Sequence, residues 1–290
     1  MSEDLRRYLT EGEQAGARFA LAAPRRVPIG SAGIHLGNRA GSSLEFKDHR
    51  EYQPGDDLRR IDWNAYARTD KLTLKLFQEE VSPHLDLVID GSRSMTLEGS
   101  AKLHATLGLS AVFAIAAMNA GFSHSTWLAG ELCRKIEGGS NRPSMWQGLT
   151  FEYKGDVAES FARLRPTWRR QGIRVLISDL LWMGDPLATL QQLARESSAI
   201  FVVQVLARVD VDPPERGNLR LVDSETERTR EIFVDMRAVQ RYKDALDRHR
   251  DNWQQACRQV GALMSTVIAE ELTMDWELEA LVAAEILKVT

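Results

Sequence analysis

The 290-residue sequence predicts an α/β protein with a mostly parallel sheet. Three short, predominantly apolar runs, at 85–89, 173–177 and 199–206, have the length of single strands and are typical of strands buried on both faces. Segments with helical patterns separate these runs. Parallel strands require connections of that length, so we expect helices on both faces of the sheet.

The composition is that of a folded chain without a strong charge bias. Hydrophobic residues make up 43% and charged residues 27% of the sequence, and the formal net charge is −4. Because there is no basic excess to neutralise phosphates, nucleic-acid binding is not expected. Two cysteines, Cys133 and Cys257, are too few for a disulfide framework or a zinc site. We therefore expect a cytoplasmic protein in a reducing compartment.

A smaller N-terminal region is expected to occupy residues 1–82. Amphipathic spacing predicts a helix from 3 to about 20, and the charged residues within it argue against a secretion signal. Pro24 and Pro28 then break the chain.

The stretch 34–71 is dense in acidic and basic residues. Within it, a Pro-Gly turn at 54–55 precedes Asp56 and Asp57, and either aspartate is placed to cap a short helix that ends near Ala67.

The remaining residues, 83–290, are expected to form the α/β domain. Alternation of apolar and polar residues predicts a strand at 72–81, in the N-terminal region. In the α/β domain, alternation and short apolar runs predict strands at 85–89, 122–128, 132–136, 173–177, 199–206 and 263–269. Helical patterns occur at 101–120, 142–149, 156–164, 185–196, 237–260 and 276–288, and a hairpin is expected at 219–234.

The stretch Ala105–Ser123 carries no formal charge and could be taken for a membrane span. A span needs about 20 strongly apolar residues. Alanine supplies most of the bulk here, and Ser110 and Asn119 interrupt the stretch. We expect a helix buried against the sheet and no direct membrane insertion.

Polar side chains follow two of the buried strands at their carboxyl ends. Asp90, Ser92 and Ser94 come directly after the first run, and Asp179 follows the second. In an open α/β sheet, sites form beyond the carboxyl ends of strands, where the strand order reverses. Oxygen ligands suit a hard cation, so these residues predict a site for Mg²⁺ or Mn²⁺. The alternative is that they cap the helices that follow.

The order Asp90-Gly-Ser92-Arg-Ser94-Met95, with Asp179 on a later strand, resembles the metal-ion-dependent adhesion site of von Willebrand factor type A domains. The resemblance implies a Rossmann-like type A domain with a mostly parallel, six-strand sheet, preceded by the smaller N-terminal region. It also implies that Asp90, Ser92, Ser94 and Asp179 hold the metal.

A longer stretch upstream of Asp90 resembles one particular bacterial family. Leu44–Arg68, which contains Arg50-Glu-Tyr-Gln-Pro-Gly-Asp-Asp-Leu-Arg-Arg-Ile-Asp-Trp63, closely resembles the signature of the bacterial domain-of-unknown-function 58 family, and Lys75, Glu79 and Glu80 continue it. Proteins of that family are commonly encoded beside MoxR-type AAA+ ATPases. The resemblance therefore implies a MoxR-type ATPase as partner, with a chaperone-like role toward client proteins.

Six residues of this signature are candidates for a partner-binding or structural role: Asp56, Asp57, Arg59, Asp62, Trp63 and Arg68. One interpretation is a structural clamp against the sheet, made of a turn, a capped helix and ion pairs, with Trp63 and Ile61 packed in the core. The other is a docking surface. Surface ion pairs contribute only about 0–1 kcal/mol each, so their number does not decide between the two.

One position departs from the type A pattern. These sites usually add a threonine from a later loop, and Gly155 stands at that place here, followed by Asp156. The resemblance therefore implies a weakened metal site unless Asp156 compensates. Restoring the hydroxyl by Gly155→Thr is expected to tighten the site.

Catalytic motifs are mostly absent. The sequence has neither a G-x-S-x-G elbow nor a G-x-x-x-x-G-K-[ST] loop. By resemblance, we expect a non-catalytic, metal-dependent adaptor that works with a MoxR-type ATPase in the assembly or activation of client proteins. The alternative is a metal-dependent phosphotransferase or phosphatase-like enzyme with Asp90 as nucleophile. Such enzymes generally carry a second acid two residues later, where this chain has Ser92.

Overall fold

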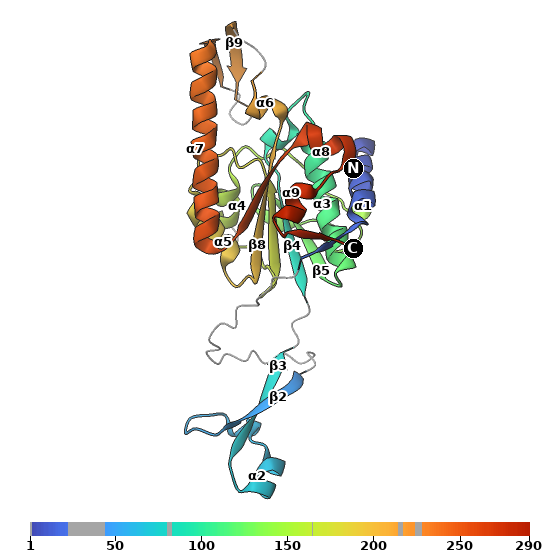
Figure 1. Cartoon of the computed structure of the whole chain (residues 1–290), viewed down its shortest axis with the longest axis vertical. Coiled ribbons are helices and arrows are strands. Elements are labelled where there is room, and N and C mark those ends of the chain that lie inside the picture. The colour runs from blue at the N-terminus through green and yellow to red at the C-terminus, as the bar shows by residue number, and fades with distance from the viewer. Residues whose placement is uncertain (1, 23–43, 80–82, 164, 214–216, 224–227) are drawn as a thin grey trace. The chain divides into compact units, whose positions relative to one another are not determined.

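A computed structural model describes residues 2–22, 44–79, 83–163, 165–213, 217–223 and 228–290 (Figure 1). The predicted breaks at Pro24 and Pro28, and Glu80 of the signature, lie outside these residues. The chain divides into two compact units. The large unit comprises Met1–Pro28 and Pro83–Thr290, and the small unit comprises Ile29–Ser82.

The large unit includes a segment that the sequence analysis placed in the N-terminal region. Helix α1 (Glu3–Gly16) packs on helix α3 (Lys102–Asn119). Strand β1 (Phe19–Leu21) pairs antiparallel with β12 (Leu287–Val289). The predicted region 1–82 is therefore not a single unit, because its first elements complete the core and a small sheet of the large unit.

The centre of the large unit is a six-stranded sheet with the order β11-β8-β7-β4-β5-β6. All neighbouring strands are parallel except β5 and β6. The predicted α/β architecture with a mostly parallel, six-strand sheet is confirmed. Its strands are β4 (His84–Asp90), β5 (Ser123–Ala129), β6 (Cys133–Lys135), β7 (Ile173–Ser178), β8 (Ala199–Leu206) and β11 (Leu263–Ile268).

The strand order reverses beside β4. From β4 the chain continues to β5 on one side, whereas β7, β8 and β11 follow in turn on the other side. The connections that leave the carboxyl ends of β4 and β7 therefore diverge. In open sheets this divergence leaves a crevice between the two strand ends.

Side chains of the parallel strands alternate between two apolar cores. Leu87 and Ile89 of β4 belong to the core that contains α3, whereas Val88 between them belongs to the opposite core. Helices α5 (Pro186–Ala194) and α7 (Met236–Val260) contribute to that second core. Burial on both faces explains why these strands are apolar along their whole length.

The uncharged stretch at 105–123 belongs mostly to α3, which is buried along most of its length, as predicted. In the described part of the chain, no helix combines the length and the apolar character that a membrane crossing requires.

The last part of the chain differs from the prediction of one helix at 276–288. Helix α8 (Ala269–Asp275) ends before this stretch, which contains only the short helix α9 (Glu279–Ala283) and the start of β12. Trp276 has a left-handed backbone with φ of 54°, which ends α8. The final strand finds its partner, β1, at the other end of the sequence, and local patterns carry no signal of such a contact.

Most other elements of the large unit agree with the predictions. The predicted hairpin is formed by β9 (Gly217–Val222) and β10 (Thr229–Val234). Helix α4 (Val157–Arg163) is present, whereas the predicted helix at 142–149 is reduced to the short 3-10 helix η3 (Pro143–Met145). A single helical turn, α6 (Arg208–Val211), follows β8.

The small unit is a two-stranded antiparallel sheet with two short helical segments. Strand β2 (Leu44–Glu51) pairs with β3 (Thr73–Glu79), and residues 80 and 81 of the strand predicted at 72–81 lie outside the described residues. The predicted single helix is divided into η1 (Leu58–Arg60) and α2 (Trp63–Thr69). Ile61 separates the two segments because it has an extended backbone and bridges to β3.

Candidate functional site

Asp90 ends β4 and is fully buried. One carboxylate oxygen accepts a hydrogen bond from the backbone N–H of Ser92 at 2.8 Å, and the other accepts from the Ser178 hydroxyl at 2.6 Å. Desolvation, and next the charge of nearby Asp179, raise the pKa of Asp90 to about 6. Asp90 is therefore a buried carboxylate with a hydrogen-bond partner at each oxygen.

Ser92 and Ser94 place their hydroxyls side by side, with the two Oγ atoms 3.0 Å apart. Backbone hydrogen bonds hold this loop to a second loop. The N–H of Arg93 donates to the carbonyl of Tyr153 at 2.9 Å, and the N–H of Tyr153 donates to the carbonyl of Gly91 at 3.3 Å. The pairing brings the residues that follow Tyr153 to the same site.

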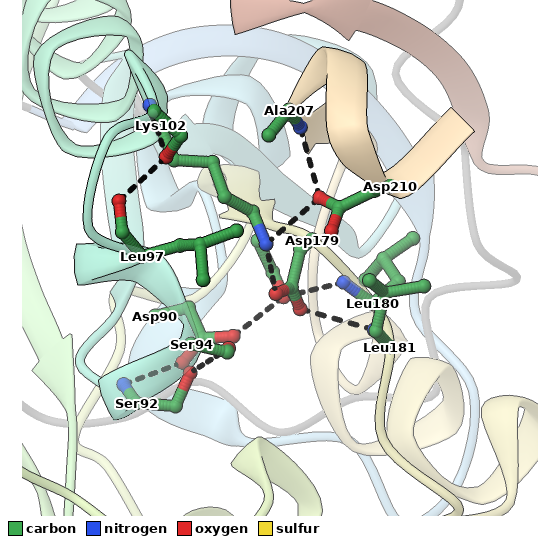
Figure 2. A network of polar contacts seen from close by, with 12 residues as sticks. Asp90, Ser92, Ser94, Leu97, Lys102, Asp179, Leu180, Leu181, Ala207 and Asp210 are labelled. Atoms are coloured by element: carbon green, nitrogen blue, oxygen red, sulfur yellow. Dashed lines mark hydrogen bonds and ion pairs between the residues drawn. The ribbon is translucent and has the colours of Figure 1, made fainter. Parts of the chain in front are cut away.

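Asp179 directly follows β7 and contacts a lysine that the sequence analysis did not select. The Nζ atom of Lys102 lies 2.8 Å from Oδ2 of Asp179 and 3.1 Å from Oδ2 of Asp210 (Figure 2). The side chains of Lys102 and Asp179 are each only 2% exposed. Burial alone would lower the pKa of Lys102, but the two carboxylates outweigh it and raise that pKa.

Backbone and amide groups fix the two aspartates that hold Lys102. The N–H of Leu181 donates to Oδ1 of Asp179 at 3.0 Å, and the side-chain amide of Gln204 donates to the Asp179 carbonyl at 2.9 Å. The N–H of Ala207 donates to Oδ2 of Asp210 at 2.9 Å. Both carboxylates therefore have set positions in the site.

These side chains meet in a pocket of about 260 Å³ at the reversal of the strand order. Three predicted ligands, Ser92, Ser94 and Asp179, line the pocket, and Asp90 lies outside the lining. The other lining residues are Leu97, Lys102, Gly155, Asp156, Leu181, Trp182, Asp210 and Asp223.

Gly155 and Asp156 reach the pocket because of the pairing between the loops of Ser92 and Tyr153. One oxygen of Asp156 accepts from the N–H of Glu159 at 2.9 Å, close to the start of α4. A β-carbon on Gly155 would overlap the hydroxyl of Tyr153. A threonine at this position would therefore require Tyr153 to move, which the sequence did not reveal.

The predicted donor set contains oxygen atoms only. In the residues that the structure describes, no group of three His, Cys, Asp or Glu side chains is arranged to hold a metal ion. The predicted set differs from such groups because two of its four members are hydroxyls.

Three aspartates of the signature organise the small unit. Asp56 accepts from Arg50 Nη2 and from the N–H of Gln53, both at 2.8 Å, and its pKa is lowered by these hydrogen bonds. Asp57 caps η1, where its Oδ1 accepts from the N–H of Arg59 at 3.1 Å.

Asp62 is the N-cap of α2. Its Oδ1 accepts from the N–H groups of Asn64 and Ala65 at 3.0 and 3.1 Å, and its Oδ2 lies 2.7 Å from Nε2 of His49. Asp62 is buried, in keeping with the structural interpretation of the signature.

Trp63 does not pack in a core. It is 60% exposed and makes an edge-on contact with Tyr66, with ring centroids 6.2 Å apart. The interpretation of Trp63 as a core residue is therefore wrong. Ile61, which was expected in the same core, is buried. Arg59 pairs with Asp57, and Arg68 donates to the carbonyl of Asn64, so both contacts lie close in the chain.

Sequence reasoning missed Lys102 and Asp210. Lys102 starts the helix after the predicted loop, and Asp210 lies in the turn after β8. A search for charged residues after each buried strand would have included Asp210. Lys102 has no comparable local signal, because a lysine at the start of a helix is usually solvated.

Comparison with known proteins gives a family match over most of the chain. Residues 48–252 match the model of a family described as "Protein of unknown function DUF58". The uncharacterized proteins Rv1480 of Mycobacterium tuberculosis and Mb1516 of Mycobacterium bovis are each 27% identical over 256 residues, covering 84% of this chain and 80% of the relative. These relatives are bacterial, like the family that the sequence resembles.

Two solved structures show a distant likeness. The conserved hypothetical protein BatB from Bacteroides thetaiotaomicron is 10% identical with a TM-score of 0.31, covering 66% of this chain and 97% of that one. An aerotolerance-related membrane protein from Bacteroides fragilis is 11% identical with a TM-score of 0.29, covering 61% and 98%.

Proposed function

This chain belongs to the DUF58 family, and on that premise we propose that it is a non-catalytic adaptor that binds partner proteins through a divalent cation. Its large unit is then a von Willebrand type A domain. The partner that the signature implies is a MoxR-type AAA+ ATPase, with which the adaptor assembles or activates client proteins. The observation that supports this proposal most directly is that Ser92, Ser94 and Asp179 share one pocket.

The residues of this pocket fit Mg²⁺ or Mn²⁺. Carboxylate and hydroxyl oxygens are the ligands that hard cations take, and the remaining positions are commonly filled by water. The charges of the neighbouring side chains also favour a cation. There is an excess of two negative charges among four side chains, namely Asp90, Asp179, Asp210 and Lys102. A divalent cation would balance that excess.

The chain's own groups favour a carboxylate from a partner as the final ligand. Ser92 and Ser94 donate no charge to a bound cation, and Asp90, which does not line the pocket, already accepts a hydrogen bond at each oxygen. A cation held there would supply an electrophilic contact for an incoming Asp or Glu. Recognition of a partner acid would then depend on both serines.

The enzyme alternative has less support. A phosphotransferase of that kind needs Asp90 as an exposed nucleophile, but both Asp90 oxygens are engaged and Asp90 does not line the pocket. Metal-dependent hydrolysis of p-nitrophenyl phosphate that is abolished in Asp90→Asn would favour the enzyme over the adaptor.

Calorimetry tests the metal site. Titration of the full chain with Mg²⁺ and with Mn²⁺ is expected to show one site that Asp90→Ala and the double variant Ser92→Ala/Ser94→Ala lose. Melting curves of the variants serve as the folding control. Absence of binding in the wild type, or unchanged binding in the variants, would contradict the proposal.

Partner binding requires a second experiment. A pull-down with a MoxR-type ATPase from the same organism is expected to retain the partner in Mg²⁺ and to lose it in EDTA. If EDTA and the serine changes do not affect retention of the partner, partner binding does not depend on the metal.

A further inference from the structure

Lys102 is a basic residue that lines the pocket and is not among the proposed ligands of the cation. Its side chain reaches from the start of α3 to the carboxylates of Asp179 and Asp210 (Figure 2). A buried ammonium is costly unless it is paired, and here two carboxylates pair with it. Such an arrangement places a permanent positive charge at the predicted cation site.

We propose that Lys102 is a built-in competitor for the divalent cation. When no divalent ion is bound, the ammonium of Lys102 pairs with Asp179. A divalent ion binds Asp179 only when the ammonium pairs with Asp210 alone. The inference rests on the proposed metal site and adds the residue that sets its affinity.

The ammonium and the metal need the same oxygen. Oδ1 of Asp179 accepts a hydrogen bond from the N–H of Leu181, so Oδ2 is the oxygen best placed for a cation. Lys102 Nζ lies 2.8 Å from that Oδ2. Like charges at such short range repel strongly where water is excluded, so both cations cannot share Oδ2 without loss.

Asp210 offers the ammonium an alternative partner. Oδ2 of Asp210 already lies 3.1 Å from Nζ and is held in place by the N–H of Ala207. An ammonium that leaves Asp179 therefore keeps one carboxylate partner. Without Asp210 it would remain in the pocket uncompensated, which would oppose metal entry.

Two sets of variants separate competition from simple charge balance. Lys102→Gln removes the ammonium, and the double variant Lys102→Gln/Asp210→Asn removes the ammonium together with one carboxylate. The double variant therefore has the same net charge as the wild type but no competitor. Lys135→Gln, which changes an exposed lysine on β6 outside this pocket, is the control for the loss of one positive charge.

Calorimetric titration of the full-length variants with Mn²⁺ and Mg²⁺ gives the readout. Both Lys102→Gln and the double variant are expected to bind at least tenfold more tightly than the wild type, whereas Lys135→Gln is expected to match it. Asp210→Asn alone is expected to bind several-fold more weakly, because Lys102 is then confined to Asp179. For a variant that is unstable without metal, the rise in melting temperature on adding Mn²⁺ replaces calorimetry, and it should exceed the rise in the wild type.

The outcomes distinguish this inference from the proposed function. Wild-type binding with no gain in the double variant overturns the role of Lys102 and leaves the metal-dependent adaptor intact. Tight binding by the double variant with none by the wild type supports the role of Lys102 and contradicts metal dependence in the natural protein. Absence of binding in every variant overturns both.

Discussion

A β-carbon on Gly155 would overlap the hydroxyl of Tyr153. The threonine that the proposed type A site would have here therefore requires Tyr153 to move. The tyrosine side chain also approaches Glu159 Oε2 at 3.4 Å, which helps to keep it in this position.

Gly155→Thr is expected to destabilise the protein by about 1–3 kcal/mol through overpacking and to leave metal affinity no better than that of the wild type. Tyr153→Ala/Gly155→Thr is expected to recover stability relative to Gly155→Thr and to bind Mn²⁺ more tightly than Tyr153→Ala. Urea unfolding and calorimetry measure the two effects. A single Gly155→Thr variant as stable as the wild type would show that Tyr153 moves without cost.

Asp62→Ala is expected to destabilise the small unit by about 0.5–2 kcal/mol, because the N-cap of α2 loses its hydrogen bonds to two backbone N–H groups. Hydrogen exchange of amides in α2 measures this change. Asn64→Ala, an exposed change in the first turn of the same helix that leaves the backbone hydrogen bonds in place, provides a comparison. Equal protection of the α2 amides from exchange in both variants would contradict a structural role of Asp62.

Trp63→Ala is expected to change global stability by less than about 0.5 kcal/mol, because the exposed ring forms little of a core. If the signature is a docking surface, the same variant should lose partner binding in the pull-down. A large loss of stability would instead show that Trp63 is covered in the folded protein.

Gly12→Leu is expected to destabilise the large unit by several kcal/mol, because a β-carbon at Gly12 would already overlap the backbone of Gly108. The exposed change Arg7→Leu on the same helix is the control. Thermal melts distinguish the two. A Gly12→Leu variant as stable as the control would mean that α1 is dispensable for the large unit.

The pH dependence of stability is expected to include a contribution from His124. Burial, opposed by its hydrogen bond to the Asn141 carbonyl, lowers the pKa of His124 below its ordinary value of 6.5. The unfolded chain therefore binds the proton first, so stability falls as the pH drops below about 6.5. His124→Gln should reduce this slope in melting curves taken between about pH 5 and pH 7.5. An unchanged slope would assign the effect to other groups.

The sheet could be predicted because the signal for each of its main strands lies within a short segment of the sequence. The runs that became β4, β7 and β8 are apolar along their length, and their burial on both faces requires that composition. Their carboxyl ends then placed Asp90, Ser92, Ser94 and Asp179 in one neighbourhood. The strand order that brings β4 beside β7 was not needed for this prediction.

The features that were missed depend on distant contacts. Strand β12 was taken for part of a helix because its partner, β1, lies at the other end of the sequence. The role of Lys102 depends on Asp179 and Asp210, which are far from it in the chain. One of the two interpretations of the signature placed Trp63 in a core, because exposure of a tryptophan cannot be read from its neighbours in sequence.

The pairing of β1 with β12 sets the order in which the two units become complete on the ribosome. The small unit is one continuous segment and is synthesised whole at an early stage. Strand β1 waits for a partner that is made about 265 residues later, a delay of tens of seconds at roughly 5–20 residues per second. During translation the small unit is therefore the first to have all its residues, whereas β1 stays without its strand partner until β12 emerges.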